Sequence, residues 1–124
     1  MTVNFKDDDL SISEVVEVFL EKHNISRKKT MYSAICVEEI VKNIFEHGFN
    51  DGKKHSIDIR ILIKGEEVIL RIRDDCRPFN PKKWQEIYND EDVTKHIGIR
   101  LVAKMAKSIQ YVNVMNLNYL TIKI

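Results

Sequence analysis

The sequence lacks any apolar stretch long enough to cross a membrane, and it contains no repeat, low-complexity tract or linker. A membrane-spanning helix needs about 18 or more predominantly apolar residues. We also expect no signal peptide at the start of the chain. With 124 residues, 44% of them hydrophobic, the composition predicts one globular domain over residues 1–124 and no membrane partner.

An excess of charge of one sign is missing as well. The chain has 20 Lys and Arg against 19 Asp and Glu, which leaves a formal charge of +1. Dedicated nucleic-acid surfaces usually appear as a basic excess, so we expect no direct nucleic-acid partner. The two cysteines, Cys36 and Cys76, lack the spacing of metal ligands and predict reduced thiols in a cytoplasmic protein.

Periodic patterns divide the first part of the chain into helices and a hairpin. Ser26 can cap the longer helix, and Gly65 lies in a turn between two alternating segments. The predicted elements are helices from Ser11 to about His23 and from Arg27 to about Gly48, and strands at Ser56–Lys64 and Val68–Arg73.

The second part begins with the polar segment Asp74–Lys95, which contains both prolines and can hold a short helix around Trp84–Tyr88. Gly98 then opens a helix that ends at about Lys107. A closing hairpin follows, with strands at Ser108–Val114 and Tyr119–Ile124 around the loop Met115–Asn118. This order predicts an α+β fold, a two-layer sandwich with helices packed on one face of a mixed, mainly antiparallel sheet.

Three polar residues repeat at four-residue intervals along the longer predicted helix: Glu39, Asn43 and His47. Because a helix turns by roughly 100° per residue, they occupy one narrow strip at the edge of the buried face. The amide oxygen of Asn43 suits Mg²⁺, and Glu39 can act as a general base. The alternatives are an amide satisfied by backbone or water at Asn43 and a C-terminal cap at His47.

The segment Asp74–Pro81 follows a predicted strand and carries the second group of candidate residues. A carboxylate fixed at Asp74 can accept a hydrogen bond from the exocyclic amine of adenine, but it would be left unpaired opposite the carbonyl of guanine. The alternative is a strand-end turn, in which Asp is common. Phe79 lines the base pocket or belongs to the core.

Two further positions complete the candidate site. Gly98 stands at the start of a predicted helix, where exposed N–H groups and the helix dipole favour an anion. In the last hairpin, Asn118 and Thr121 can approach the base through water.

These segments match three sequence motifs in a fixed order. The strip Glu39-xxx-Asn43-xxx-His47 is followed by DDCRPFNP at 74–81, which resembles DDGxPFDP, and by HIGIRLV at 96–102, which resembles GxGIxLV. The tail, residues 118–122, resembles the final strand of the same group. The chain thus resembles the GHKL ATP-binding superfamily of gyrase, heat-shock chaperone ATPases, histidine kinases and mismatch-repair ATPases, and looks most similar to the small anti-sigma-factor serine kinases of bacteria.

The resemblance implies a Bergerat-type ATP-binding fold with ATP and Mg²⁺ as cofactors. It implies that Asn43 holds the metal, that Asp74 recognises adenine and that Glu39 is the general base for a partner's serine. The implied partner is a sigma factor or an anti-anti-sigma-like protein, and a homodimer is a family expectation.

The sequence departs from the motifs at two glycines, since Cys76 and His96 stand where the family has Gly. Glycine lets the backbone approach a ligand or adopt a positive φ. Each replacement costs on the order of 1–3 kcal/mol, or roughly a 5- to 150-fold loss of ATP affinity. The alternative function is therefore a non-catalytic protein-interaction module with weak or lost nucleotide binding.

Overall fold

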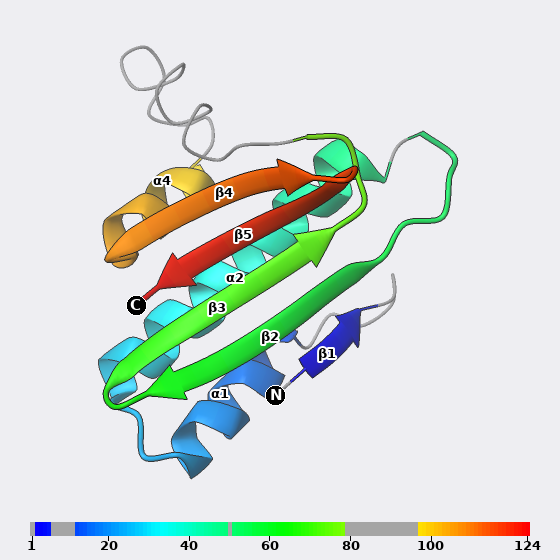
Figure 1. Ribbon diagram of the computed structural model, residues 1–124. Helices are drawn as coiled ribbons and strands as arrows, with labels where there is room; N and C mark the ends of the chain where they lie inside the picture. The colour runs from blue at the N-terminus through cyan, green and yellow to red at the C-terminus, as the bar shows by residue number, and fades with distance from the viewer. Residues whose placement is uncertain (1, 6–11, 50, 79–96) are drawn as a thin grey trace.

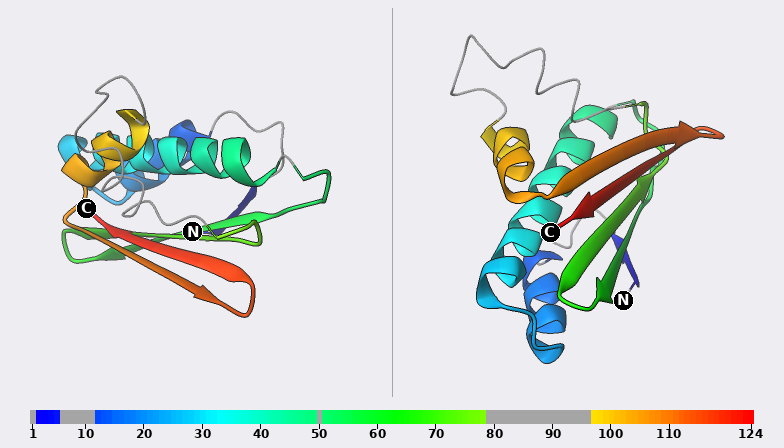
Figure 2. Two further views of the ribbon diagram at one scale, coloured as in Figure 1. Left: turned by 90° about the horizontal axis from the view of Figure 1, so that it is seen from above. Right: turned by 60° about the vertical axis from the view of Figure 1, so that its left-hand side comes forward.

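The computed structural model describes residues 2–5, 12–49, 51–78 and 97–124, and arranges them in two layers (Figure 1). An antiparallel sheet forms one layer and the helices cover one of its faces, as the view from above shows (Figure 2). The helices are α1 (Ile12–Lys22), α2 (Arg27–Gly48) and α4 (Ile97–Met105). The strands are β1 (Thr2–Phe5), β2 (Ile57–Lys64), β3 (Glu67–Asp74), β4 (Ser108–Val114) and β5 (Leu117–Lys123).

The strand order is β1-β2-β3-β5-β4, and each of the four pairings between described strands is antiparallel. The expected α+β two-layer fold is confirmed. The expectation of a mixed sheet is wrong for the described strands, because β2–β3 and β4–β5 are hairpins and β5 runs back along β3. The short strand β1 at Thr2–Phe5, which pairs with β2, was not expected from the sequence.

Helix α2 positions the polar strip. Its start is fixed by Ser26, whose side chain accepts a hydrogen bond from the backbone N–H of Lys29 at 3.3 Å. Its apolar side is buried against the sheet at intervals of three and four residues, as an amphipathic helix requires. The buried apolar residues of this face are Ala34, Cys36, Val37, Ile40, Val41 and Ile44.

The β4–β5 hairpin turns in two residues. Met115 and Asn116 have φ angles of 52° and 63°, the positive values of a type I′ turn, which matches the twist of the strands that it joins. Leu117 and Asn118 therefore belong to β5, which corrects the expected loop Met115–Asn118. This register places Asn118 opposite Asp74.

No helix in the described ranges is both long and apolar enough to cross a membrane. The short helix expected around Trp84–Tyr88 lies outside the described residues.

Candidate active site

A buried carboxylate–amide pair lies at the end of the two central strands. Asp74 is the last residue of β3 and is 7% exposed, and Asn118 faces it from β5 at 3% exposed. The Nδ2 of Asn118 donates to Oδ1 of Asp74 at 2.8 Å and to the carbonyl of Cys76 at 2.9 Å. The backbone N–H of Cys76 donates to the same Oδ1 at 3.0 Å. The carboxylate is thereby held in one orientation.

The orientation of the Asn118 amide is fixed from its other side. Its Oδ1 accepts hydrogen bonds from the hydroxyl of Tyr111 at 2.5 Å and from Nδ2 of Asn113 at 2.9 Å. With the oxygen engaged by two donors, the amide nitrogen must face Asp74. Asn118 is therefore a residue that positions Asp74. This role depends on the pairing of β3 with β5, which no sequence spacing reveals.

Burial raises the pKa of the Asp74 carboxyl, while the donors from Asn118 and Cys76 act against the shift. Both nitrogen donors converge on Oδ1, and the Cys76 thiol also hydrogen-bonds to the carboxylate, so Oδ2 has no nitrogen donor among the described residues. An acceptor that is fixed, buried and not yet paired with an N–H suits an amine of a ligand.

Asp74 opens onto a pocket between α2 and the ends of β3 and β5. Its volume is about 20 Å³, room for roughly one water molecule. The residues that line it are Ile40, Ile44, His47, Gly48, Asp74, Cys76, Arg77, Tyr111, Asn118 and Leu120.

The side chain of Cys76 fills the space next to the end of α2. A Cβ placed on Gly48 would lie 2.5 Å from Cβ and 2.6 Å from Sγ of Cys76, so Gly48 is required for this close approach. Burial, with Asp74 next, raises the pKa of the Cys76 thiol to about 12. The thiol is therefore uncharged and lines the pocket, at a position where the motif DDGxPFDP has glycine.

The strip on α2 is half-buried at Glu39, Asn43 and His47, as the four-residue spacing predicted. The Nδ2 of Asn43 donates to the carbonyl of Glu39 at 2.9 Å. Its Oδ1 accepts no hydrogen bond from the described residues, which leaves a neutral hard oxygen of the kind that Mg²⁺ binds. His47 lines the pocket, and its backbone carbonyl accepts from Nε of Arg77 at 2.7 Å.

Glu39 lies against the beginning of α4. A Cβ on Gly98 would overlap Oε2 of Glu39 and lie 2.9 Å from its Cδ, so glycine is what lets the carboxylate reach this helix start. A carboxylate is favoured there by the helix dipole. The structure thus brings Glu39 and Gly98 together, two candidates from separate motifs.

The structure does not bring every candidate residue to this pocket. Thr121 lies on the opposite, open face of the sheet, since strand alternation turns residues 118 and 121 to different sides. The expectation that Thr121 approaches the base is therefore corrected. Phe79 and His96 lie outside the described residues.

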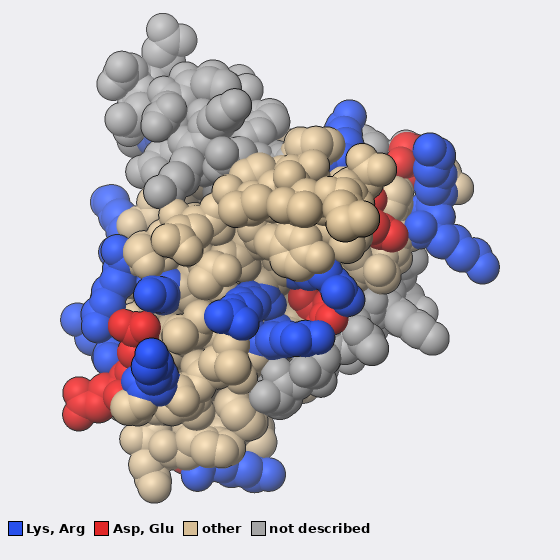
Figure 3. Space-filling model, in the orientation of Figure 1, with Lys and Arg blue, Asp and Glu red and all other residues tan. Residues whose placement is uncertain are grey.

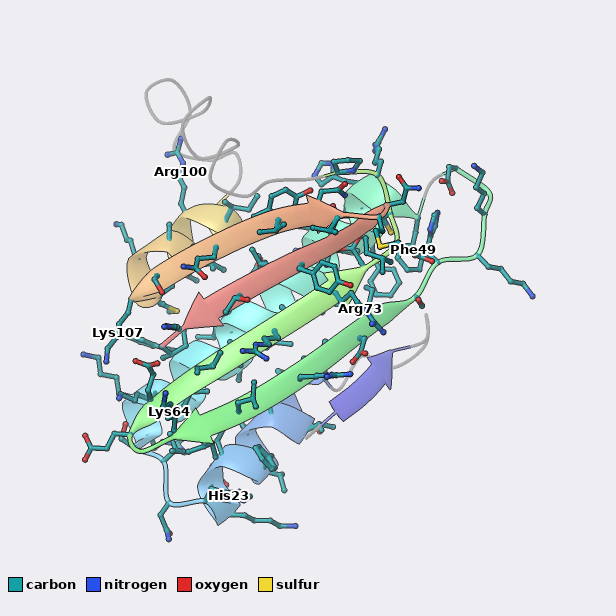
Figure 4. The ribbon with its side chains drawn as sticks, viewed as in Figure 1. His23, Phe49, Lys64, Arg73, Arg100 and Lys107 are labelled. Carbon is teal, nitrogen blue, oxygen red and sulfur yellow. The ribbon has the colours of Figure 1, made fainter. Side chains whose placement is uncertain are left out.

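The open face of the sheet carries a local cluster of arginines (Figure 3). Arg73, which Figure 4 places on this face, contacts Oδ2 of Asp58 at 3.0 Å. Arg60 and Arg71 are directly opposite each other in the ladder, a pairing of like charges that is destabilising without an anion. A cavity of about 180 Å³ lies here, lined by Asp58, Arg60, Arg71, Ile72, Arg73, Tyr119 and Thr121. The net charge of +1 does not reveal this cluster, although Arg60 of β2 and the alternating Arg71 and Arg73 of β3 are visible in the sequence.

Residues 7–124 match the model of the family described as the histidine kinase-like ATPase domain. Among solved structures, the histidine kinase domain of the blue-light activated histidine kinase from Erythrobacter litoralis EL346 has a TM-score of 0.60 and 18% identity, over 78% of this chain and 44% of that one. The nucleotide-free catalytic domain of histidine kinase ThkA has a TM-score of 0.59 and 16% identity, over 100% of this chain and 96% of that one.

At these identities the likeness to solved structures shows a shared fold. The chain spans less than half of the blue-light kinase domain, and 31% of a longer chain of that kinase. No curated protein matches the chain.

Proposed function

Because the chain belongs to the histidine kinase-like ATPase family, whose domains generally bind ATP with Mg²⁺, we propose that it is an ATP–Mg²⁺-binding regulatory domain of the anti-sigma-factor serine kinase type. The observation that carries the proposal is the state of Asp74. This carboxylate is buried at the pocket, is held by Asn118 and the Cys76 backbone, and has one oxygen without a nitrogen donor among the described residues.

Each part of the nucleotide has a fitting group on this chain. Asp74 would accept the adenine amine, Oδ1 of Asn43 would hold the Mg²⁺, and the N–H groups at the start of α4, beside Gly98, suit a phosphate. When bound, ATP supplies the phosphoryl group for transfer. The further cofactor-contact candidates His47 and Cys76 line the same pocket.

In this proposal Glu39 is the general base. Its carboxylate would take the proton of a serine hydroxyl on the partner, so that the serine oxygen could bond to the γ-phosphorus while the bond from that phosphorus to ADP breaks and ADP leaves. The carboxylate sits at the start of α4, beside Gly98, where the helix dipole favours a negative charge.

The partner would be a protein, either a sigma factor or an anti-anti-sigma-like substrate, in the cytoplasm. The arginines of the open sheet face support this part of the proposal, since Arg60 and Arg71 offer paired positive charge to an acidic segment of a partner. A second copy of the chain, as in a homodimer, is a further candidate partner.

A thermal-shift titration with ATP, ADP and GTP, each with and without Mg²⁺, tests the proposal. A ligand that binds the folded state raises its stability by mass action, so even millimolar affinity produces a shift. We expect a Mg²⁺-dependent shift with ATP, no comparable shift with GTP, and loss of the Mg²⁺ dependence in Asn43→Ala. Unchanged Mg²⁺-dependent binding in Asn43→Ala would contradict the role of the α2 strip.

One observation favours a second function, a non-catalytic interaction module of the same fold. The pocket beside Asp74 holds about 20 Å³ because the Cys76 side chain packs on Gly48. In that case the natural protein shows no shift at millimolar nucleotide, and Cys76→Gly combined with His96→Gly restores binding. Tight ATP binding by the unmodified chain rejects this alternative.

A further inference from the structure

The imidazole of His55 is held between two carboxylates. Its Nδ1 lies 3.1 Å from Oδ1 of Asp75, and its Nε2 lies 2.8 Å and 2.9 Å from the two carboxylate oxygens of Asp51. The His55 side chain is only 8% exposed, and its ring packs on that of Phe49 with centroids 5.4 Å apart. A neutral imidazole has a single N–H, so one of the two ring nitrogens needs a second proton or a cation to face a carboxylate oxygen.

A thiol completes this cluster. One ligand atom each from His55, Asp75 and Cys76 all lie within 4.8 Å of one another. The residues come from two segments, the connection between α2 and β2 and the loop that follows β3. Figure 4 labels Phe49 at this end of the sheet, beside the C-terminal end of α2.

We propose that His55, Asp75 and Cys76 form a zinc site, with Asp51 as the carboxylate that orients the histidine. The donor set decides the metal, since thiolate, imidazole and carboxylate together suit Zn²⁺, whereas Mg²⁺ prefers oxygen ligands alone. Three protein ligands leave a fourth position for water. The side chains of Asp75 and Asp51 are 37% and 42% exposed, which gives the ion a route from solvent.

The distance between the nitrogen and oxygen ligand atoms fits this assignment. Two ligands bonded to zinc at about 2.0–2.1 Å with tetrahedral geometry are roughly 3.3 Å apart. The separation of Nδ1 of His55 and Oδ1 of Asp75 is 3.1 Å. Asp51 contacts Nε2 with both oxygens, as carboxylates behind a metal-bound histidine do, which places the N–H on Nε2 and the lone pair on Nδ1.

Binding of Zn²⁺ displaces the thiol proton of Cys76 to solvent, together with the Nδ1 proton where His55 is an imidazolium. Without a metal, burial and the carboxylates of Asp74 and Asp75 raise the pKa of the thiol to about 12. A divalent cation reverses this effect, because it stabilises the thiolate and neutralises the carboxylates. The same carboxylates that keep Cys76 protonated thus become favourable neighbours of the ion.

The site would join the connection between α2 and β2 to the loop that follows β3, and this loop lines the pocket. Cys76 and Asp74 both line that pocket, so an ion at Cys76 lies next to the residue assigned to adenine. The zinc site itself does not depend on nucleotide binding, and it can be tested with the metal alone.

The experiment is a titration of the tag-free, metal-free chain with Co²⁺, followed by competition with Zn²⁺. Thiolate ligation of Co²⁺ gives a charge-transfer band, and tetrahedral geometry gives intense visible bands. The variants are Cys76→Ser, His55→Gln and Asp51→Asn, and the matched control is Cys36→Ser, which removes the other free cysteine of the chain. Circular dichroism checks that each variant is folded.

We expect one Co²⁺ per chain with a charge-transfer band that Zn²⁺ abolishes and Mg²⁺ does not. The band is lost in Cys76→Ser and kept in Cys36→Ser, and Asp51→Asn weakens Zn²⁺ binding by about 10- to 100-fold. Absence of the band in the natural chain, or its persistence in Cys76→Ser, overturns the proposal. If Cys76→Ser does not fold, the surface variant Asp51→Asn decides, and unchanged Zn²⁺ affinity there overturns it equally.

Discussion

Replacing Asp74 with Asn separates recognition of the base from stability of the fold. In the variant, an amide oxygen can still accept the hydrogen bonds from the Cys76 backbone and from Asn118, which now end on Oδ1. The atom that changes is Oδ2, which becomes an NH₂ group. The NH₂ group of the new side chain then faces the exocyclic amine of adenine, so that two hydrogen-bond donors oppose each other. The negative charge of the carboxylate is also lost.

The loss of ATP affinity follows from that exchange. A hydrogen bond to a charged acceptor contributes about 1.5–3 kcal/mol, and the repulsion between two donors adds to its loss. We therefore expect ATP binding to weaken by at least about 10- to 150-fold in Asp74→Asn, with discrimination against GTP reduced.

Stability is expected to change in the other direction. Burial raises the pKa of Asp74 from its ordinary value of 3.8, so the folded state binds the proton more tightly than the unfolded state does. The stability that this preference gives is fully present below pH 3.8 and is lost as the pH rises through the raised pKa. Asn is neutral throughout, so the melting temperature of the variant should equal or exceed that of the natural chain at neutral pH, with the gain shrinking toward acid.

Two measurements check this pair of outcomes. Isothermal titration with Mg²⁺–ATP gives the affinity, and thermal melts of metal-free protein in EDTA between pH 4 and 8 give the stability. Glu38→Gln is the matched control, since Glu38 is an exposed carboxylate that does not line the pocket. Equal ATP affinity in Asp74→Asn and the natural chain would refute the assignment of adenine to this carboxylate.

Three further substitutions test the close contacts of the fold. Gly48→Ala should destabilise the protein by about 1–3 kcal/mol in urea unfolding, because its Cβ would lie 2.5 Å from Cβ of Cys76. Adding Cys76→Gly to the same chain should restore most of the lost stability. Independent effects of the two substitutions in a double-mutant cycle would contradict the contact. Gly98→Ala should displace the Glu39 carboxylate from the start of α4, lowering any phosphotransfer while the melting temperature changes little, and full activity in this variant would argue against Glu39 as the base. Arg60→Glu should stabilise the sheet by roughly 0.2–1 kcal/mol because it faces Arg71, whereas the control Lys64→Glu, opposite Glu67, should destabilise it; the same sign for both would show that the cross-strand charges do not act.

Local features were readable from the sequence. The Ser26 cap, the apolar period of α2 and the four-residue spacing of Glu39, Asn43 and His47 lie within one helix, whose geometry repeats every few residues. The same is true of the β2–β3 hairpin, where alternation and Gly65 set the strands. The glycine positions in the motifs also indicated where a side chain would intrude, and Cys76 does pack on Gly48.

The contacts that define the sites depend on the register between distant segments. A two-residue turn at Met115 and Asn116, in place of a four-residue loop, brings Asn118 into contact with Asp74 and turns Thr121 to the other face. The approach of His55 to Asp75 and Cys76 likewise joins segments that no sequence spacing relates. The periods of helices and strands are local, so the sequence by itself determined them. The pairing of strands across the sheet and the packing of α2 on β3 depend on the whole chain. Only the tertiary structure therefore decided which side chains meet in the two sites.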